Sequence, residues 1–216
     1  MGFFNPDNKI INGINKCVDC VWLSLLWFVC SLPIITSGAA STALYYAINK
    51  NIRHDRGQPT QAFFTSFKKN FKQCTKIWAV MLFLYALLGF DYYIMKRLIN
   101  LGEEIGYLYK AFLVFMIFIS LWGLYIFPYI ARFQNTIPET LFTTLYIAFR
   151  NLHYTLLLAL IFVGAFVLIY MYPPITIAMP AMYHLFKNRI LERVFVKYMS
   201  PEQQQEELER NRVYYN

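Results

Sequence analysis

Four long apolar runs, separated by polar and mostly basic gaps, constrain this chain more than any other feature. They cover residues 18–32, 77–94, 111–130 and 152–172. A helix needs about 20 apolar residues to cross the hydrocarbon core of a bilayer, and the first run approaches that length when its apolar flanks are added. The sequence therefore predicts an all-α fold, a polytopic transmembrane helical bundle.

The composition agrees with a membrane protein. Hydrophobic residues make up 58% of the chain and charged residues 15%, whereas soluble domains are about 25% charged. The formal net charge of +8 also occurs in proteins that bind nucleic acids. Here, however, the lysines and arginines lie in the gaps between apolar runs, as they do beside membrane helices. We therefore expect a lipid bilayer, and no nucleic acid, as a partner.

Proline and glycine mark two places where apolar sequence reverses. Pro33 and Gly38 follow the first long run, and Pro173, Pro174 and Pro180 follow the last one. A proline inside a helix lacks an N–H donor and clashes with the preceding turn. Both proline clusters are therefore predicted to be structural reversals that end a membrane span.

A short apolar segment follows each reversal, at residues 39–48 and 175–186. In the first, Ala39, Ala43 and Ala47 recur at a spacing of four, which lets two helix backbones approach closely in a membrane. A proline is expected to interrupt the second segment. Each segment is predicted to be a return span, and the alternatives are a short helix at the membrane surface or a re-entrant hairpin.

Two amphipathic helices are predicted to lie in the membrane surface. In the first, within the basic stretch 49–76, Lys68, Lys69 and Lys72 lie on a different helical face from four phenylalanines, Phe63, Phe64, Phe67 and Phe71. This pattern is typical of a helix at the lipid–water boundary, and a helix packed on the protein itself is the alternative. We expect the stretch to contact anionic lipid headgroups.

The second amphipathic helix begins after Thr136, which forms a predicted capping box with Glu139. Its inward face is predicted to consist of Leu141, Phe142, Leu145 and Phe149.

The distribution of basic residues favours about six membrane segments, four long and two short. With both termini in the cytoplasm, six segments place on that side all of the 20 lysines and arginines except Lys96, Arg97 and Lys110, as the positive-inside rule requires. Residues 1–200 are then one transmembrane helical domain, and residues 201–216 are a charged cytoplasmic tail. Re-entrant hairpins would alter this alternation.

Few ionisable side chains lie in or near the apolar runs. Ionisable groups inside a membrane are costly and commonly functional. The candidate polar pathway therefore consists of Asp91, Arg132, His153 and His184, although an interfacial position also explains Asp91 and His153.

The sequence contains no motif of a known enzyme or cofactor site. Cys17 and Cys20 form a C-x-x-C pair, but zinc requires two further ligands and there is no second such pair. The motifs H-E-x-x-H, G-x-S-x-G and the P-loop are also absent. We expect no enzymatic activity, no catalytic residue, no cofactor and no metal.

Several short motifs resemble those of the YesL-like family of small bacterial integral membrane proteins, a domain of unknown function. They are SLPIITxGAA at residues 31–40, Tyr45-Tyr46, FxxFKxNFKQ at residues 64–73, and Pro128-x-x-x-Arg132-Phe133. The resemblance implies a multi-pass protein of the bacterial plasma membrane. It also implies a link to carbohydrate uptake, because such proteins are commonly encoded beside components of sugar ABC transporters.

Two functions are consistent with these observations. The first is a non-enzymatic accessory or subunit of a carbohydrate-uptake system, with sugar ABC-transporter components as partners. The alternative is a small-solute transporter or channel in its own right, since proline-broken segments in corresponding positions are typical of transporter sites.

Overall fold

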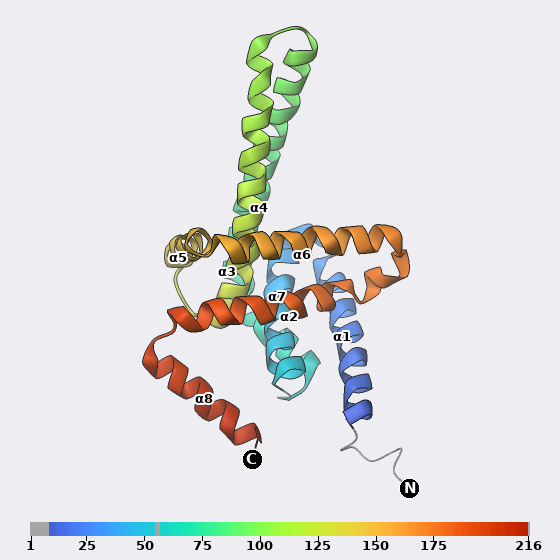
Figure 1. The fold of residues 1–216 in the computed structure, drawn as a ribbon, viewed down its shortest axis with the longest axis vertical. Helices are drawn as coiled ribbons and strands as arrows, with labels where there is room; N and C mark the ends of the chain where they lie inside the picture. Colours follow the sequence, from blue (N-terminus) through green and yellow to red (C-terminus); the bar gives the residue numbers. More distant parts are fainter. Residues whose placement is uncertain (1–8, 55–56, 216) are drawn as a thin grey trace.

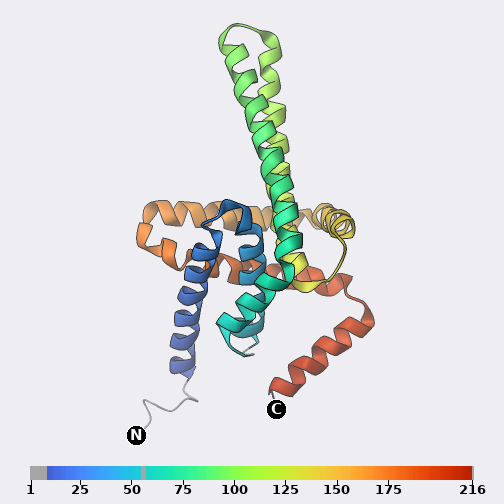
Figure 2. The same cartoon turned by 180° about the vertical axis from the view of Figure 1, so that it is seen from behind.

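The computed structural model describes residues 9–54 and 57–215, and it contains no strand within these ranges. The chain runs through the elements α1 (Lys9–Ser31), η1 (Ile34–Thr36), α2 (Ser37–Ala47), η2 (Ile48–Arg53), α3 (Pro59–Asn100), η3 (Glu104–Leu108), α4 (Tyr109–Arg132), α5 (Ile137–Arg150), α6 (Leu152–Met171), η4 (Pro173–Ile177), α7 (Met179–Phe195), η5 (Val196–Tyr198) and α8 (Pro201–Tyr215). Figure 1 shows their arrangement, and Figure 2 the opposite face.

Four helical segments in the described part are long and apolar enough to cross a membrane, namely Gly13–Ser31, Pro59–Asn100, Glu104–Arg132 and Leu152–Met171. They contain the four apolar runs except for the last residue of the first run and of the last one, so the all-α class and these four helices are confirmed. The short segments lie in α2, which has 11 residues, and α7, which has 17. The total of six membrane segments stays a prediction, as does the division into two domains.

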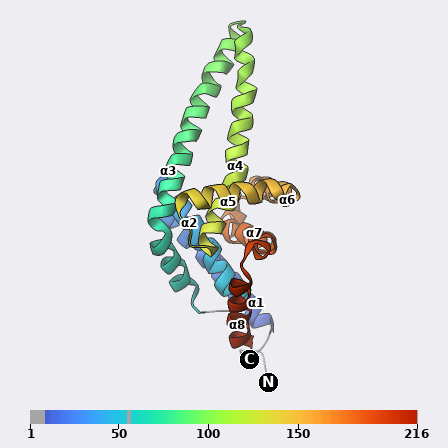
Figure 3. The same cartoon turned by 90° about the vertical axis from the view of Figure 1, so that its left-hand side faces the viewer.

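Helix α3 joins two regions that the sequence predicted as separate elements. Its 42 residues correspond to about 63 Å at 1.5 Å per residue, roughly twice the thickness of a bilayer core. The predicted amphipathic helix is the first half of α3, and the apolar run 77–94 continues it. The prediction of two separate helices was wrong. No proline follows Pro59 in this helix, and Gly89 alone does not break it. Figure 3 shows α3 and α4 as one long hairpin.

The first proline cluster lies between α1 and α2. Helix α1 ends at Ser31, and α2 begins at Ser37 after one short turn that follows Pro33. The Thr36 hydroxyl shares its proton between the carbonyl oxygens of Cys30 at 2.6 Å and Pro33 at 2.7 Å. The Cys30 carbonyl belongs to the last turn of α1 and is left unpaired by the helix itself.

The second reversal uses the same chemistry. Helix α6 ends at Met171, and the Thr176 hydroxyl donates to the Pro173 carbonyl oxygen at 2.6 Å. Pro180 was expected to interrupt the return segment. It lies instead in the first turn of α7, and the helix continues beyond it. A proline is tolerated there because its missing N–H has no intrahelical partner in any case.

Helix α2 lies at the centre of the molecule. Ala39, Ala43 and Ala47 are fully buried, which confirms that this small-residue face packs closely. The Trp22 indole N–H donates to the Thr60 hydroxyl at 2.9 Å, and the Trp78 indole N–H donates to the Ile34 carbonyl at 2.7 Å. These two bonds place the α1–α2 hairpin beside the first half of α3.

The second half of α3 extends beyond this body with α4, while α6 and α7 run across it (Figures 1 and 2). Exposed apolar side chains, including Phe83, Phe90, Val114 and Phe115, line the extended hairpin. The four apolar helices therefore do not stand side by side in one parallel layer.

The buried face of α5 differs from the prediction. The capping box is confirmed, with the Thr136 N–H donating to Glu139 Oε2 at 3.0 Å. Phe142 and Phe149 are exposed, however, and the buried residues are Thr140, Thr144, Ile147 and Ala148. Apolar residues on a helix beside a membrane need not face the protein, because lipid is an equally apolar environment.

Gly38 should be essential for the packing of α2. A Cβ added at Gly38 would lie 2.7 Å from Phe127 Cε1 and 2.9 Å from Trp78 Cβ. Gly38→Ala is therefore expected to reduce stability by about 1–3 kcal/mol, the usual cost of overpacking, measured by thermal unfolding in detergent. Gly164→Ala in α6, where nothing lies within 4 Å of the added carbon, is the control. Equal melting temperatures for the two variants would contradict this packing.

The topology can be tested by labelling single cysteines from outside intact cells. Helices α1 and α8 approach the end of the molecule opposite the α3–α4 turn (Figure 1). In a background lacking the four native cysteines, we expect a cysteine at Glu104 to be labelled and cysteines at Lys72 and Glu202 to be protected. Labelling at Glu202 together with Glu104 would place the C-terminal helix outside and contradict the topology with both termini inside.

Candidate functional site

The carboxylate of Glu192, which is 4% exposed, is bonded by side chains from three other elements. Its Oε2 pairs with Arg132 Nη2 at 2.9 Å. Its Oε1 accepts hydrogen bonds from the Tyr45 hydroxyl at 2.9 Å and from Asn49 Nδ2 at 3.4 Å. The partners come from α4, α2 and η2, so one carboxylate connects three parts of the chain to α7.

Helical spacing brings these side chains together. Tyr45 and Asn49 are four residues apart along α2 and η2, and Arg132 is the last residue of α4. On α7, His184, Asn188 and Glu192 recur every four residues, so they share one face. All three are buried, so this face of α7 is polar and turned into the protein.

Two further ionisable groups extend this polar cluster. The His184 ring packs edge-on against Tyr45, with ring centroids 6.4 Å apart. Lys187 is 4% exposed and its Nζ lies 5.4 Å from the centre of the Tyr183 ring.

The last apolar segment was predicted to end at residue 186. The part of the site that lies beyond this residue on α7 was therefore not predicted. In the structure α7 continues to Phe195, with Lys187, Asn188 and Glu192 buried. The polar stripe at 184, 188 and 192, combined with apolar Leu191 and Phe195, was the signal that could have identified the helix. It was missed because charged residues were expected only on exposed surfaces.

Of the predicted pathway residues, the structure brings Arg132 and His184 to the same cluster. Arg132 pairs with Glu192, and His184 packs against Tyr45, the hydrogen-bond partner of Glu192. Asp91 lies near the far end of α3, and His153 is exposed at the start of α6 with its ring 4.1 Å from that of Tyr154. The four residues therefore do not form one group.

A pocket of about 640 Å³ adjoins the polar cluster, and we call it the basic pocket. It is lined by parts of α2, η2, α3, the end of α4 and α8. Its walls are about equally polar and apolar. Its basic side chains are Lys50, His54, Lys69 and Arg132, and Glu206 is its acidic one. Asn49 and Arg132 belong to both the cluster and the pocket, so the Glu192 network supports one wall of the pocket.

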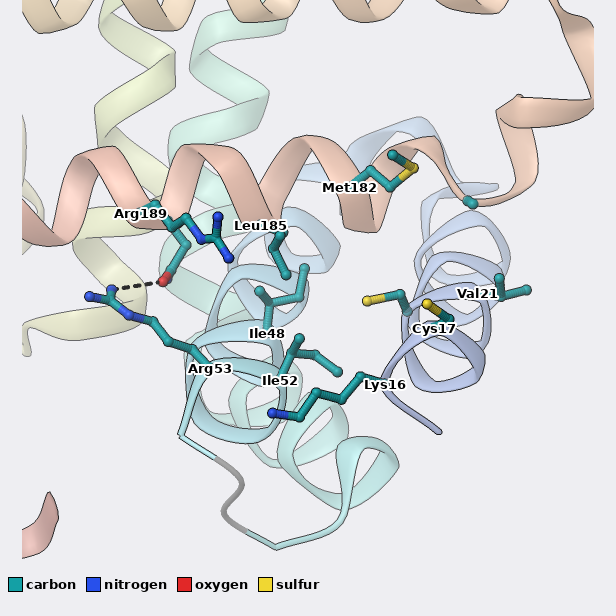
Figure 4. A pocket seen from close by; sticks show the side chains of 12 residues that line it. Lys16, Cys17, Val21, Ile48, Ile52, Arg53, Met182, Leu185 and Arg189 are labelled. Carbon is teal, nitrogen blue, oxygen red and sulfur yellow. Dashed lines mark hydrogen bonds between the residues drawn. The ribbon is translucent and has the colours of Figure 1, made fainter. Parts of the chain in front are cut away.

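A second pocket, of about 580 Å³, lies between α1, η2 and α7, and we call it the α1–α7 groove. Figure 4 shows its apolar side chains together with three basic ones, Lys16, Arg53 and Arg189. Cys17 and Cys20 also line it. No group of three His, Cys, Asp or Glu side chains suited to a metal occurs among the described residues.

The pair formed by Arg132 and Glu192 should hold α7 in place. Arg132→Gln and Glu192→Gln are each expected to destabilise the protein by about 3 kcal/mol, because each removes one member of a largely buried ion pair. The measurement is unfolding in detergent, with Arg193→Gln on the exposed side of α7 as the control. A variant with both residues changed to Gln should lose less than the sum of the single losses. Additive losses would contradict direct coupling.

Comparison with known proteins supports a family of unknown function. A family model described as "Protein of unknown function, DUF624" matches residues 20–92, which are 73 of the 216 residues. The matched region contains most of α1, all of α2 and α3 as far as Tyr92, but neither Arg132 nor Glu192. No curated protein and no solved structure matches. Together with the four apolar helices, the match is compatible with an integral membrane protein of unestablished role.

Proposed function

We propose that this protein is a non-enzymatic accessory or subunit of a carbohydrate-uptake system in the bacterial plasma membrane, with both termini in the cytoplasm. The observation that supports this role most directly is the basic pocket, an open and partly polar surface that is suited to a partner protein. The link to carbohydrate comes from the resemblance to the YesL-like family, and sugar ABC-transporter components are the proposed partners.

The basic pocket has the chemistry of a docking surface for an acidic segment. Lys50 and Lys69 approach it from η2 and α3, and Asn70, Ser66 and Thr65 add hydrogen-bonding groups. The Lys50 ammonium lies 5.9 Å from the centre of the Tyr46 ring. Charged and polar groups of this kind give orientation and specificity to an interface.

The pocket lies at the end of the body that faces α8, because Gln203 and Glu206 contribute to its lining. This is the side that the proposed topology places in the cytoplasm, where an ABC transporter binds its ATPase. On the same side, Lys68, Lys72 and Lys76 are exposed along the first half of α3. We propose that this part of the stretch 49–76 contacts anionic lipid headgroups, at about 1 kcal/mol per charge near the surface.

The geometry supports the alternative, a small-solute transporter or channel, less well. A transport pathway requires polar groups that line one route through the membrane. Asp91 lies near the far end of α3 and His153 is exposed at the start of α6, and the Glu192 carboxylate is already bonded by three side chains.

The proposal predicts a specific co-purification. The tagged protein, extracted in mild detergent from its native bacterium, should retain a sugar ABC permease or ATPase identified by mass spectrometry. Lys50→Glu with Lys69→Glu should reduce that recovery at least about fivefold, since the charge reversals repel an acidic partner segment. Lys96→Glu with Arg97→Glu, near the far end of α3, makes the same charge change outside the pocket and should have no effect.

Two outcomes would overturn the proposal. One is the recovery of neither a permease nor an ATPase above the untagged background. The other is solute uptake by the purified protein alone in liposomes, which would favour the transporter.

A further inference from the structure

The α1–α7 groove combines a cationic end with apolar walls. Lys16 on α1, Arg53 on η2 and Arg189 on α7 supply the positive charge, and no acidic residue lines the groove in the described structure. In Figure 4 the Lys16 side chain reaches from α1 toward η2, beneath Ile52. Three cations from three separate elements thus approach one space, so the groove is electrostatically complementary to an anion.

Asn188 adds a second, independent indication of a ligand. It is 1% exposed and lines the groove. Its Oδ1 accepts a hydrogen bond from Arg53 Nη1 at 3.1 Å, the dashed line in Figure 4, while its Nδ2 has no hydrogen-bond partner. A buried donor without an acceptor is unfavourable, and an oxygen of a bound anion would satisfy it.

The remaining walls are apolar. Ile48 and Ile52 form one side, Met182 and Leu185 a second, and Val21 a third. Val21 is 37% exposed, and it continues into the exposed apolar face of α1 that includes Val18 and Trp22. A hydrocarbon chain can therefore pass from the outer surface of α1 into the groove without crossing a polar barrier.

We propose that the α1–α7 groove binds one anionic phospholipid. Its phosphate would bind Arg53 and Arg189 and accept a hydrogen bond from Asn188 Nδ2, and one acyl chain would lie against Val21 and Met182. A soluble anion would use the cationic end but leave the apolar walls exposed to water. The groove volume of about 580 Å³ lies within the range of about 300–1,000 Å³ usual for ligand sites.

Such a lipid would contact three elements at once and would connect α1 to α7. This site is distinct from the exposed lysines of α3, which can attract many headgroups without holding any one of them. It is also independent of the proposed partner surface, because Lys50 and Lys69 do not line the groove.

Native mass spectrometry of the delipidated full-length protein tests the proposal. Phosphatidylglycerol should bind with a stoichiometry of one, and phosphatidylcholine with the same acyl chains should not. Arg53→Gln with Arg189→Gln should weaken phosphatidylglycerol binding about tenfold, because two charge-assisted hydrogen bonds are lost. Lys68→Gln with Lys72→Gln, which removes the same charge from the exposed side of α3, is the control. Equal weakening by the two pairs would show diffuse attraction and overturn the site.

Two further measurements separate a lipid from a soluble phosphate and guard against misfolded variants. Met182→Trp fills the apolar part of the groove from a side chain that is 39% exposed and leaves the three cations in place, so it should also reduce phosphatidylglycerol binding. Glycerol 3-phosphate should not compete. Retention of the lipid by a monodisperse Met182→Trp variant, or displacement by glycerol 3-phosphate, would mean that only the headgroup is recognised and would overturn the proposal.

Discussion

Burial of the Glu192 carboxylate is the constraint on which the arrangement of the body depends. A carboxylate removed from water must be paired and hydrogen-bonded, or it becomes strongly unfavourable. Arg132, Tyr45 and Asn49 satisfy this requirement, and they come from α4, α2 and η2. The crossing of α7 over the central helices is therefore fixed by directional bonds in addition to packing. Apolar contact alone would tolerate many crossing positions, because it has little directional preference.

The two pockets follow from the same crossing. On one side, Asn49 and Arg132 contribute to the basic pocket, and on the other, Asn188 and Arg53 contribute to the α1–α7 groove. The first is partly polar and suited to a protein segment, whereas the second is apolar with a cationic end and suited to a lipid. The two proposed ligands thus differ in chemistry while their binding surfaces share one structural support.

Local patterns predicted the helices well and their mutual contacts poorly. The four apolar runs, the reversal at Pro33 and the capping box at Thr136 depend on residues close in sequence, so spacing alone identifies them. The prediction that Phe142 faces the protein interior was wrong, because lipid and the protein interior are both favourable environments for an apolar side chain. Of the candidate site, Arg132 and His184 were found as rare ionisable groups. Glu192 was not, since its burial depends on partners more than 50 residues away in the sequence.

The continuity of α3 has a mechanical consequence. Near the middle of this helix, Trp78 lies against Gly38 and Phe127, where there is no room for an additional methyl group. The helix extends from that tight contact in both directions, toward the hairpin turn and toward Lys69 in the basic pocket. Because α3 is continuous, the hairpin and one wall of the basic pocket belong to the same helix. A displacement of the hairpin would therefore be transmitted along α3, past the contact at Trp78, to Lys69.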